Sequence, residues 1–370
     1  MNKKKYFIIL IGIFLYVLIL LGQDGLPIEE TNIISGVGYD IEKKSEGIIE
    51  YILPLSINVY KLNGKISNVT LEEKGENIGE VIQNRQEKLN KKVTQGQERV
   101  VLISEKYARF GVKNIIEDRF RNVEINDMAF IAVCRGETEK YFKMKVKGYN
   151  SSAEYIEGLI ESSHTHNFFS ENYKLIDMYV RIDAEGKTLV LPYIEMSKEG
   201  IEIAGMTIFK EDKMVKAINL DEAKILNLLK ESNVKGVVSL KRSPKEYVDF
   251  DANTGKRKVK CYKEGEKYSF VIDLNLTGNI ISNEMYTDLT KDIKKRKKFE
   301  EDMAKSIEEQ CYDFIKIMQN QYKIDCIDLG KEAAAKFGRR KKVDWNRVVS
   351  NAEIKVNVKV KVEAQGRGDF

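Results

Sequence analysis

The sequence predicts an α+β fold of mixed sheets with packed helices, in two to three domains after an N-terminal hydrophobic segment. Segments with strand-like alternation interleave with segments whose apolar residues recur at helical spacing, which favours mixed α/β domains over a bundle or a sandwich. The 370 residues exceed the usual length of one domain. Hydrophobic residues make up 42% and charged residues 32%, so the chain can bury a core and is not low-complexity.

The N-terminus is a charged start followed by an apolar run. Lys3, Lys4 and Lys5 precede sixteen uncharged residues that begin with Tyr6 and end with Leu21. That length lies between a signal-peptide core and a bilayer span of about 20 residues. Because lysines at the front of such a segment stay in the cytoplasm, we expect the rest of the chain to be exported. Residues 1–24 are therefore predicted to be an export or anchor segment.

Two fates of this segment stay open. The small residues that a signal peptidase needs are missing before Gly22, and Gln23 stands where a bacterial lipoprotein carries its lipid-bearing Cys. The most economical interpretation is an uncleaved anchor from Tyr6 to Leu21. A signal peptide cut at another site is the alternative.

Residues 25–197 are predicted to form an N-terminal α/β domain. Residues 32–62 alternate apolar and polar, which indicates strands. Gly36 and Gly38 within them favour close packing or a bulge over a phosphate-binding turn, because no third Gly and no helix follow. We expect helices at residues 77–90, 105–110, 115–119, 153–163 and in part of 168–181, and strands at residues 100–104, 127–135, 141–146 and 188–194.

Residues 198–370 are predicted to form a C-terminal α/β region, which admits a further division near residues 250–270. The boundary follows from a polar turn at residues 197–200, after which strand periodicity restarts in a hairpin bent at residues 211–213. We expect helices at residues 221–229 and 333–337, with Asp221 capping or charging the first, and strands at residues 237–240, 256–262, 268–280 and 352–363. The longest helix is expected at residues 294–322, on an apolar stripe of Phe299, Met303, Ile307, Cys311, Phe314 and Met318.

Composition and spacing argue against several classes of function. A net charge of +5 is too small for a general grip on nucleic acid. The four cysteines lie too far apart in sequence for a zinc loop, and we expect buried thiols, although spacing leaves one disulfide open among Cys134, Cys261, Cys311 and Cys326. His164 and His166 lack the third His that a catalytic zinc site normally needs. No spaced carboxylate pair distinguishes itself, so we predict no enzyme, no cofactor and no metal.

Several blocks of sequence resemble one known family. They are NIISGVGYD at residues 32–40, VVLISEKYARFGV at 100–112 with RNVE at 121–124, GMTIFKEDK at 205–213, and DCIDLG at 325–330 followed by Trp345 and the alternating strand at 355–362. Their order and spacing resemble the Ger(x)C family, the C subunits of spore nutrient germinant receptors. The resemblance extends from about residue 25 to the C-terminus. The chain departs from the family at Gln23, so its tether is assigned to the uncleaved segment.

The resemblance implies a non-enzymatic, membrane-tethered subunit that is needed for receptor assembly and for the germination response. It implies a place on the outer, non-cytoplasmic face of the spore inner membrane. The implied partners are an integral-membrane A subunit and a transporter-like B subunit. The alternative is an exported protein that binds a small ligand or a cell-wall fragment.

Candidate interaction residues lie in or near these blocks. They are Ser104, Glu105, Arg109, Arg121, Glu124 and Trp345. For each, the competing interpretation is a local role as a helix cap or a partly buried ion pair. Four consecutive cations are candidates for contact with anionic lipid, at up to about 1 kcal/mol each. They are Arg339, Arg340, Lys341 and Lys342.

Overall fold

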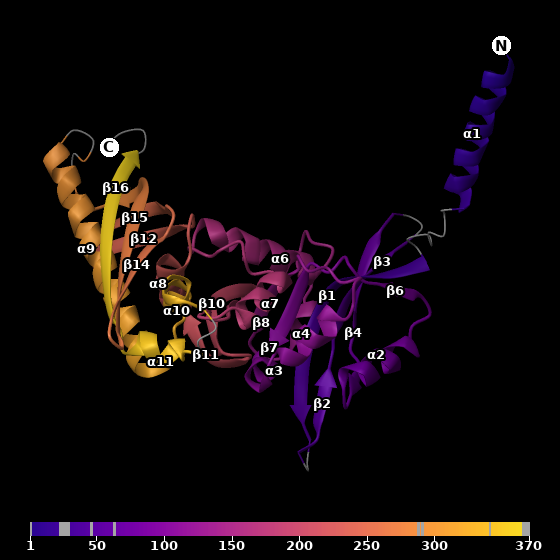
Figure 1. Ribbon diagram of the computed structural model, residues 1–370, viewed down its shortest axis with the longest axis horizontal. Helices are drawn as coiled ribbons and strands as arrows, with labels where there is room; N and C mark the ends of the chain where they lie inside the picture. The colour runs from indigo at the N-terminus through magenta and orange to yellow at the C-terminus, as the bar shows by residue number, and fades with distance from the viewer. Residues whose placement is uncertain are drawn as a thin grey trace.

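Two β-sheets with helices packed against them make up the protein. The computed structural model describes residues 2–21, 30–44, 47–61, 64–286, 289, 292–339 and 342–364. In Figure 1 the two sheets lie side by side along the long axis, and α1 (Asn2–Leu21) stands apart, beyond the first sheet. The predicted α+β class is confirmed.

The first sheet is mixed, with parallel strands at its centre. Its path runs through β11 (Lys213–Asn219), β10 (Ile201–Lys210), β9 (Val190–Met196), β8 (Phe130–Cys134), β7 (Val100–Ser104), β1 (Thr31–Lys43), β2 (Ile49–Ile52) and β5 (Lys74–Gly75). Beside this path, β3 (Leu55–Tyr60) and β6 (Lys92–Thr94) pair with β1, and β4 (Ile66–Leu71) pairs with β3. The run β1, β7, β8 and β9 is parallel.

Helices cover both faces of this sheet. On β7, Val100 and Leu102 pack toward α5 (Thr138–Lys143) and α6 (Ser152–Ser162). Their neighbours Val101 and Ile103 pack toward the opposite face, which is covered by α2 (Ile78–Gln86), α3 (Glu105–Phe110), α4 (Lys113–Phe120) and α7 (Leu175–Asp183). A parallel strand buried on both faces reads as an unbroken apolar run, which is why residues 100–104 were recognisable from sequence.

The second sheet is built around one long strand. The path is β12 (Lys235–Ser243), β13 (Glu246–Thr254), β15 (Lys267–Asn283) and β14 (Lys258–Glu264), and β16 (Glu353–Ala364) pairs in parallel with β15. The helices of this half are α8 (Leu220–Lys230), α9 (Ile293–Ile317), α10 (Leu329–Phe337) and α11 (Trp345–Ser350). All six residues of the predicted apolar stripe on α9 and its continuation are buried, as are the valines of β16.

Side chains of α9 occupy the free edge of β16. Three backbone N–H groups donate to them: Val356 to Tyr312 Oη at 3.1 Å, Val358 to Glu308 Oε1 at 2.8 Å, and Val362 to Glu300 Oε1 at 3.0 Å. The three acceptors recur every fourth residue or multiple of it, so they lie on one helix face. This contact closes an edge that would otherwise present unpaired donors to another strand.

The predicted boundary at residue 197 falls within the first sheet. The hairpin of β10 and β11 pairs with β9 and continues that sheet to Asn219. Met206 and Ile208 of β10 also share a core with α8, α9 and the second sheet. The division into residues 25–197 and 198–370 therefore stays a proposal.

Two local predictions were wrong. Residues 141–146 do not form a strand, because α5 occupies Thr138–Lys143. The backbone N–H of Thr138, at the start of this helix, donates to Oδ2 of Asp40 at 3.0 Å, and Asp40 is far away in the sequence. Strand β13 was missed because Asp and Asn, which are poor strand formers, fill its less buried positions. For α8, the charging role expected of Asp221 is confirmed: Asn219 caps the helix, and Asp221 lies in its first turn, where a negative charge favours the helix N-terminus.

The interpretation of Gly36 is confirmed. A Cβ at this position would lie 2.8 Å from the Phe142 ring, and the pairing register of β1 with β3 shifts between Ile34 and Gly36. The glycine therefore serves both close packing and a bulge. All four cysteines are buried and free, so the disulfide left open by their spacing does not form.

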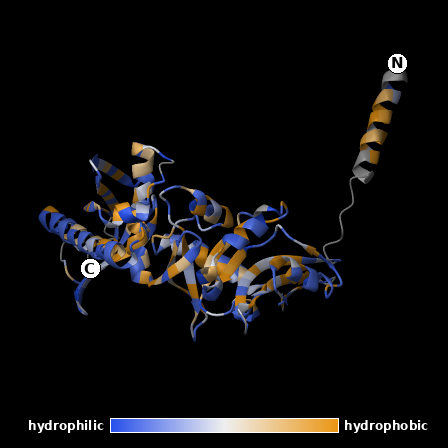
Figure 2. Cartoon of the chain, turned by 60° about the horizontal axis from the view of Figure 1, so that its bottom comes forward, coloured by the Kyte–Doolittle hydropathy of each residue, from blue (hydrophilic) through white to orange (hydrophobic). Residues whose placement is uncertain are grey.

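The N-terminal helix exposes apolar side chains. Phe7, Leu10 and Phe14 are 66%, 69% and 62% exposed, and Figure 2 shows the middle of α1 as largely hydrophobic. Among the described helices, none has both the length and the apolarity required of a membrane span.

Candidate functional site

Ser104 and Glu105 begin α3 directly after β7. Ser104 is 1% exposed, and its Oγ accepts a hydrogen bond from the backbone N–H of Tyr107 at 3.2 Å, so it is a helix cap. Glu105 Oε1 accepts from Arg109 Nη2 at 2.7 Å, and Glu105 Oε2 accepts from Tyr193 Oη at 2.8 Å. Burial would raise the pKa of Glu105, but these hydrogen bonds outweigh it and hold the pKa below its ordinary value.

The structure brings Glu105 and Arg109 together as a helical ion pair. Arg109 also donates through Nη1 to the carbonyl oxygen of Val215 at 3.4 Å, so it links α3 to β11. Its side chain is still 47% exposed. Of this trio, Arg109 therefore offers the most surface to a partner.

Arg121 and Glu124 lie in the exposed segment after α4. Arg121 follows the helix directly, and the backbone N–H of Glu124 donates to Asn122 Oδ1 at 3.0 Å. Both residues are exposed. Their side chains are available at the surface, in keeping with the predicted role.

Trp345 is an anchor of the second half of the chain. It is 6% exposed, its Nε1 donates to Glu185 Oε1 at 3.1 Å, and its ring meets that of Tyr268 edge to face at 5.9 Å. Its side chain also packs against Gly330, where a Cβ would lie 2.6 Å away. Because it is buried, its direct role is in packing.

The basic run at residues 339–342 is described only at its two ends. Arg339 and Lys342 are exposed, whereas Arg340 and Lys341 lie outside the described residues. The predicted contact with a membrane surface stays a prediction.

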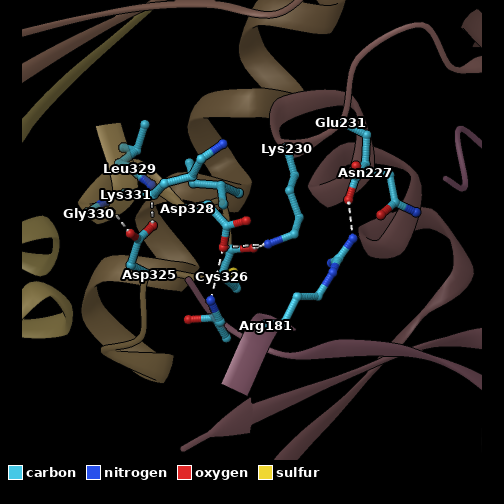
Figure 3. Close-up of polar contacts among 12 residues, drawn as sticks. Arg181, Asn227, Lys230, Glu231, Asp325, Cys326, Asp328, Leu329, Gly330 and Lys331 are labelled. Atoms are coloured by element: carbon cyan, nitrogen blue, oxygen red, sulfur yellow. Dashed lines mark hydrogen bonds and ion pairs between the residues drawn. The ribbon is translucent and has the colours of Figure 1, made fainter. Parts of the chain in front are cut away.

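A polar cavity that sequence analysis missed lies between the two sheets. Its volume is about 410 Å³. It is lined by Asn172, Arg181, Lys187, Lys230, Glu231, Ser232, Lys256, Arg257, Val259, Asp328, Lys331 and Glu332. Arg181 comes from α7, Lys230 ends α8, Arg257 precedes β14, and Asp328 precedes α10, so four separate segments meet here. Figure 3 shows how the side chains of Arg181, Lys230 and Asp328 converge.

A buried ion pair forms one wall of the cavity. Lys230 Nζ lies 2.6 Å from Asp328 Oδ1 and also donates to the carbonyl oxygen of Cys326 at 3.2 Å. The backbone N–H of Thr188 donates to the same Asp328 oxygen at 3.0 Å. Burial would raise the pKa of Asp328, but Lys230 and Arg181 outweigh it and lower the pKa. The carboxylate therefore joins the start of β9 to α8 and α10.

A second buried carboxylate stands behind this pair. Asp325 Oδ1 accepts from the N–H of Leu329 at 3.0 Å, and Oδ2 accepts from that of Gly330 at 2.6 Å, so it satisfies donors at the start of α10. Burial, together with repulsion from Asp328, raises the pKa of Asp325 to about 6. The backbone N–H donors oppose that rise without cancelling it.

Two arginines of the cavity have unused donors. Arg181 Nη2 donates to Glu231 Oε1 at 3.3 Å, but Nη1 is buried without a hydrogen-bond partner. Arg257 Nη2 donates to the carbonyl oxygen of Ile327 at 2.8 Å, and its buried Nε lacks a partner. Such donors are uncommon in folded proteins and call for an explanation.

Local patterns do not reveal this cavity. Lys230 and Asp328 are separated by 98 positions, and only the fold brings them together. The DCIDLG block contains both buried carboxylates, but nothing in its sequence predicts which lysine pairs with Asp328. Among the described residues, no group of three or more His, Cys, Asp or Glu side chains is placed to hold a metal ion.

Comparison with known proteins gives a family to both halves of the chain. Residues 24–196 match the family described as the spore germination protein N-terminal domain, and residues 204–366 match the one described as spore germination B3/GerAC like, C-terminal. The spore germination protein GerQC of Bacillus cereus is 23% identical over 345 residues, covering 92% of this chain and 93% of the relative.

The fold has a solved counterpart as well. The crystal structure of the GerBC protein matches with a TM-score of 0.59 at 15% identity, over 89% of this chain and 97% of the other. The family matches cover both sheets, and the resemblance seen in the ordered sequence blocks is confirmed. The chain belongs to the GerAC-like family of spore germination proteins, the C subunits of germinant receptors.

Proposed function

We propose that this chain is a non-enzymatic, membrane-tethered subunit of a spore nutrient germinant receptor and acts through assembly. The observation that carries the proposal is the family match through both sheets, at residues 24–196 and 204–366. The buried acids described above serve structure: Asp328 pairs with Lys230, and Asp325 satisfies the start of α10. The same match favours a receptor subunit over a free-standing exported binding protein.

The proposed partners are an integral-membrane A subunit and a transporter-like B subunit. The proposed place is the outer face of the spore inner membrane, with residues 6–21 as the tether. The exposed apolar side chains of α1 support a tether, because such a surface is favourable in a lipid environment and unfavourable in water.

A gene deletion tests the role. Spores that lack the chain should form normally and fail to germinate with one defined nutrient, and a restored copy should recover the response. Unchanged responses to a full panel of nutrients would contradict the proposal, provided that the strain has no other gene of this family.

The tether has its own test. After an alkaline carbonate wash, the chain should remain in the membrane fraction, and mass spectrometry should recover peptides from residues 6–21. A mature N-terminus beyond residue 22 would show that the segment is removed, and the tether would then have to be sought elsewhere.

The interaction surface is proposed at the exposed candidates Arg109, Arg121 and Glu124. Substituting Arg109 and Arg121 by Gln removes surface charge but no buried side chain. The double variant should fold and reach the membrane in normal amounts yet recover less of its membrane partners. Lys355→Gln, an exposed lysine on β16, is the matched control. Equal partner recovery with all three proteins would remove these residues from the interface.

A further inference from the structure

The cavity between the two sheets has more positive than negative side chains. Six cations line it: Arg181, Lys187, Lys230, Lys256, Arg257 and Lys331. Three carboxylates accompany them: Glu231, Asp328 and Glu332. Three of the cations lie within 4 Å of one of these carboxylates, at 3.3 Å for Arg181, 2.6 Å for Lys230 and 3.8 Å for Lys331.

The remaining three cations lack such a partner. Within the described part of the chain, no carboxylate lies at ion-pair distance from Lys187, Lys256 or Arg257. Burial lowers the pKa of Lys187, with Asp328 opposing and Lys331 adding to the shift. Burial likewise lowers the pKa of Arg257. Both directions are those of cations that are desolvated without enough counter-charge.

Donors inside the cavity wall point to what is missing. Arg181 is 8% exposed, and its Nη1 has no hydrogen-bond partner; the buried Nε of Arg257 has none either. A buried guanidinium N–H without an acceptor is costly, and an anion supplies both the acceptor and the charge. Guanidinium groups match the planar fork of a carboxylate or the oxygens of a phosphate.

We propose that this cavity binds a small soluble anion carrying a carboxylate or a phosphate group. Arg181 and Arg257 hold the anionic group, and the exposed Lys256 attracts it at the rim. Because the lining comes from α7, α8, the turn before β14 and the segment before α10, the bound anion stiffens the junction of the two sheets. The site is a property of this subunit and does not depend on its assembly with partners.

Calorimetric titration of the purified full-length chain in detergent tests the proposal. Inorganic phosphate and succinate are the probes, each added at constant ionic strength set with sodium chloride. We expect saturable binding of one or both, and a melting temperature that rises with probe concentration, as for any ligand that binds only the folded state.

Two variants and a control locate the site. Lys256→Gln removes an exposed charge and should weaken binding about threefold to tenfold without changing the fold. Arg181→Gln should weaken it further; should this variant unfold, Lys256→Gln alone decides. Lys355→Gln, an exposed lysine outside the cavity, should bind as the parent does.

Two results would overturn the proposal. One is the absence of any heat or stabilisation beyond that of sodium chloride at equal ionic strength. The other is binding that Lys256→Gln and Lys355→Gln leave equally intact, because the anion would then bind elsewhere.

Discussion

Replacing Lys230 by Met would remove the cation that neutralises a buried carboxylate between the two sheets. The Lys230 side chain is 1% exposed, and its Nζ lies 2.6 Å from Asp328 Oδ1. Met is close in length and apolar, so the change removes charge and donors rather than volume. Asp328 would keep its hydrogen bond from Thr188, and the carbonyl of Cys326 would lose a donor.

The expected cost is large because the pair is buried. Removing one partner of a buried ion pair typically costs about 3–5 kcal/mol, since the other charge stays without compensation. Arg181 also lowers the pKa of Asp328 and will offset part of this loss. We therefore expect the free energy of unfolding to fall by about 3 kcal/mol at pH 7.

Urea unfolding of the full-length chain in detergent measures this loss. Trp345 is the single tryptophan, and its contacts with Glu185 and Tyr268 make its fluorescence a reporter of the second half of the chain. Asp328→Asn and the double variant complete a mutant cycle, in which we expect a coupling of more than about 1.5 kcal/mol. Lys355→Met, on the exposed face of β16, should change the unfolding energy by less than about 0.5 kcal/mol.

The pH dependence gives a second check. The pKa of Asp328 is lowered in the folded state, so its contribution to stability is present above the ordinary value of 3.8 and is lost as pH falls through the folded pKa. The difference between the parent and Lys230→Met should therefore shrink in acid. A loss below about 1 kcal/mol at pH 7, or additive single variants, would refute this account of the pair.

Three further predictions follow from single contacts. The pKa of Asp325 is raised to about 6 by burial, so stability should fall by about 2.4 kcal/mol as pH rises from 4 to 7, and Asp325→Asn should flatten that slope. Glu308→Ala removes the acceptor for the N–H of Val358 at the β16 edge, which should cost about 1 kcal/mol in urea unfolding and promote association seen by light scattering. Gly205→Ala should cost more than about 2 kcal/mol, because φ is +152° and the added Cβ would overlap the carbonyl oxygen of Ile218.

The Asp325 prediction has a contradicting outcome, and the other two have matched control variants. For the Asp325 variant, an unchanged stability slope between pH 4 and pH 7 would show that this carboxyl does not titrate there. Glu309→Ala lies on the exposed side of the same helix and should neither destabilise nor associate. In Gly158→Ala the added Cβ points into open space on α6, so this variant should stabilise the protein by about 0.5–1 kcal/mol. A loss of stability there would contradict the argument that the cost at Gly205 comes from its φ and the overlap of its Cβ.

Elements whose burial follows a simple period were predictable from sequence. In three elements the pattern of apolar residues alone shows which positions are buried. They are α9 with its apolar stripe, β16 with its alternation and β7 with its apolar run. Helix α5 did not, because Asp40 holds its start from a distant strand. Strand β13 was not predicted because polar residues occupy its less buried side.

For the candidate sites too, contacts between residues close in sequence were predictable, and contacts that depend on the tertiary fold were not. The sequence identified Glu105 and Arg109 as candidate interaction residues, and the ion pair that the structure shows between them is local because of their i, i+4 spacing. It could not show that Ser104 and Trp345 are buried. The cavity could not be predicted from the sequence, because its charged side chains come from four segments that only the tertiary structure brings together.

The central claim is that this chain works as one subunit of a membrane receptor complex. The most direct test is a pull-down of the tagged full-length chain from spore membranes in mild detergent, with partners identified by mass spectrometry. We expect two integral-membrane proteins, one of them transporter-like, to co-purify in constant proportion. Recovery of the chain alone, from a soluble fraction, would contradict the claim.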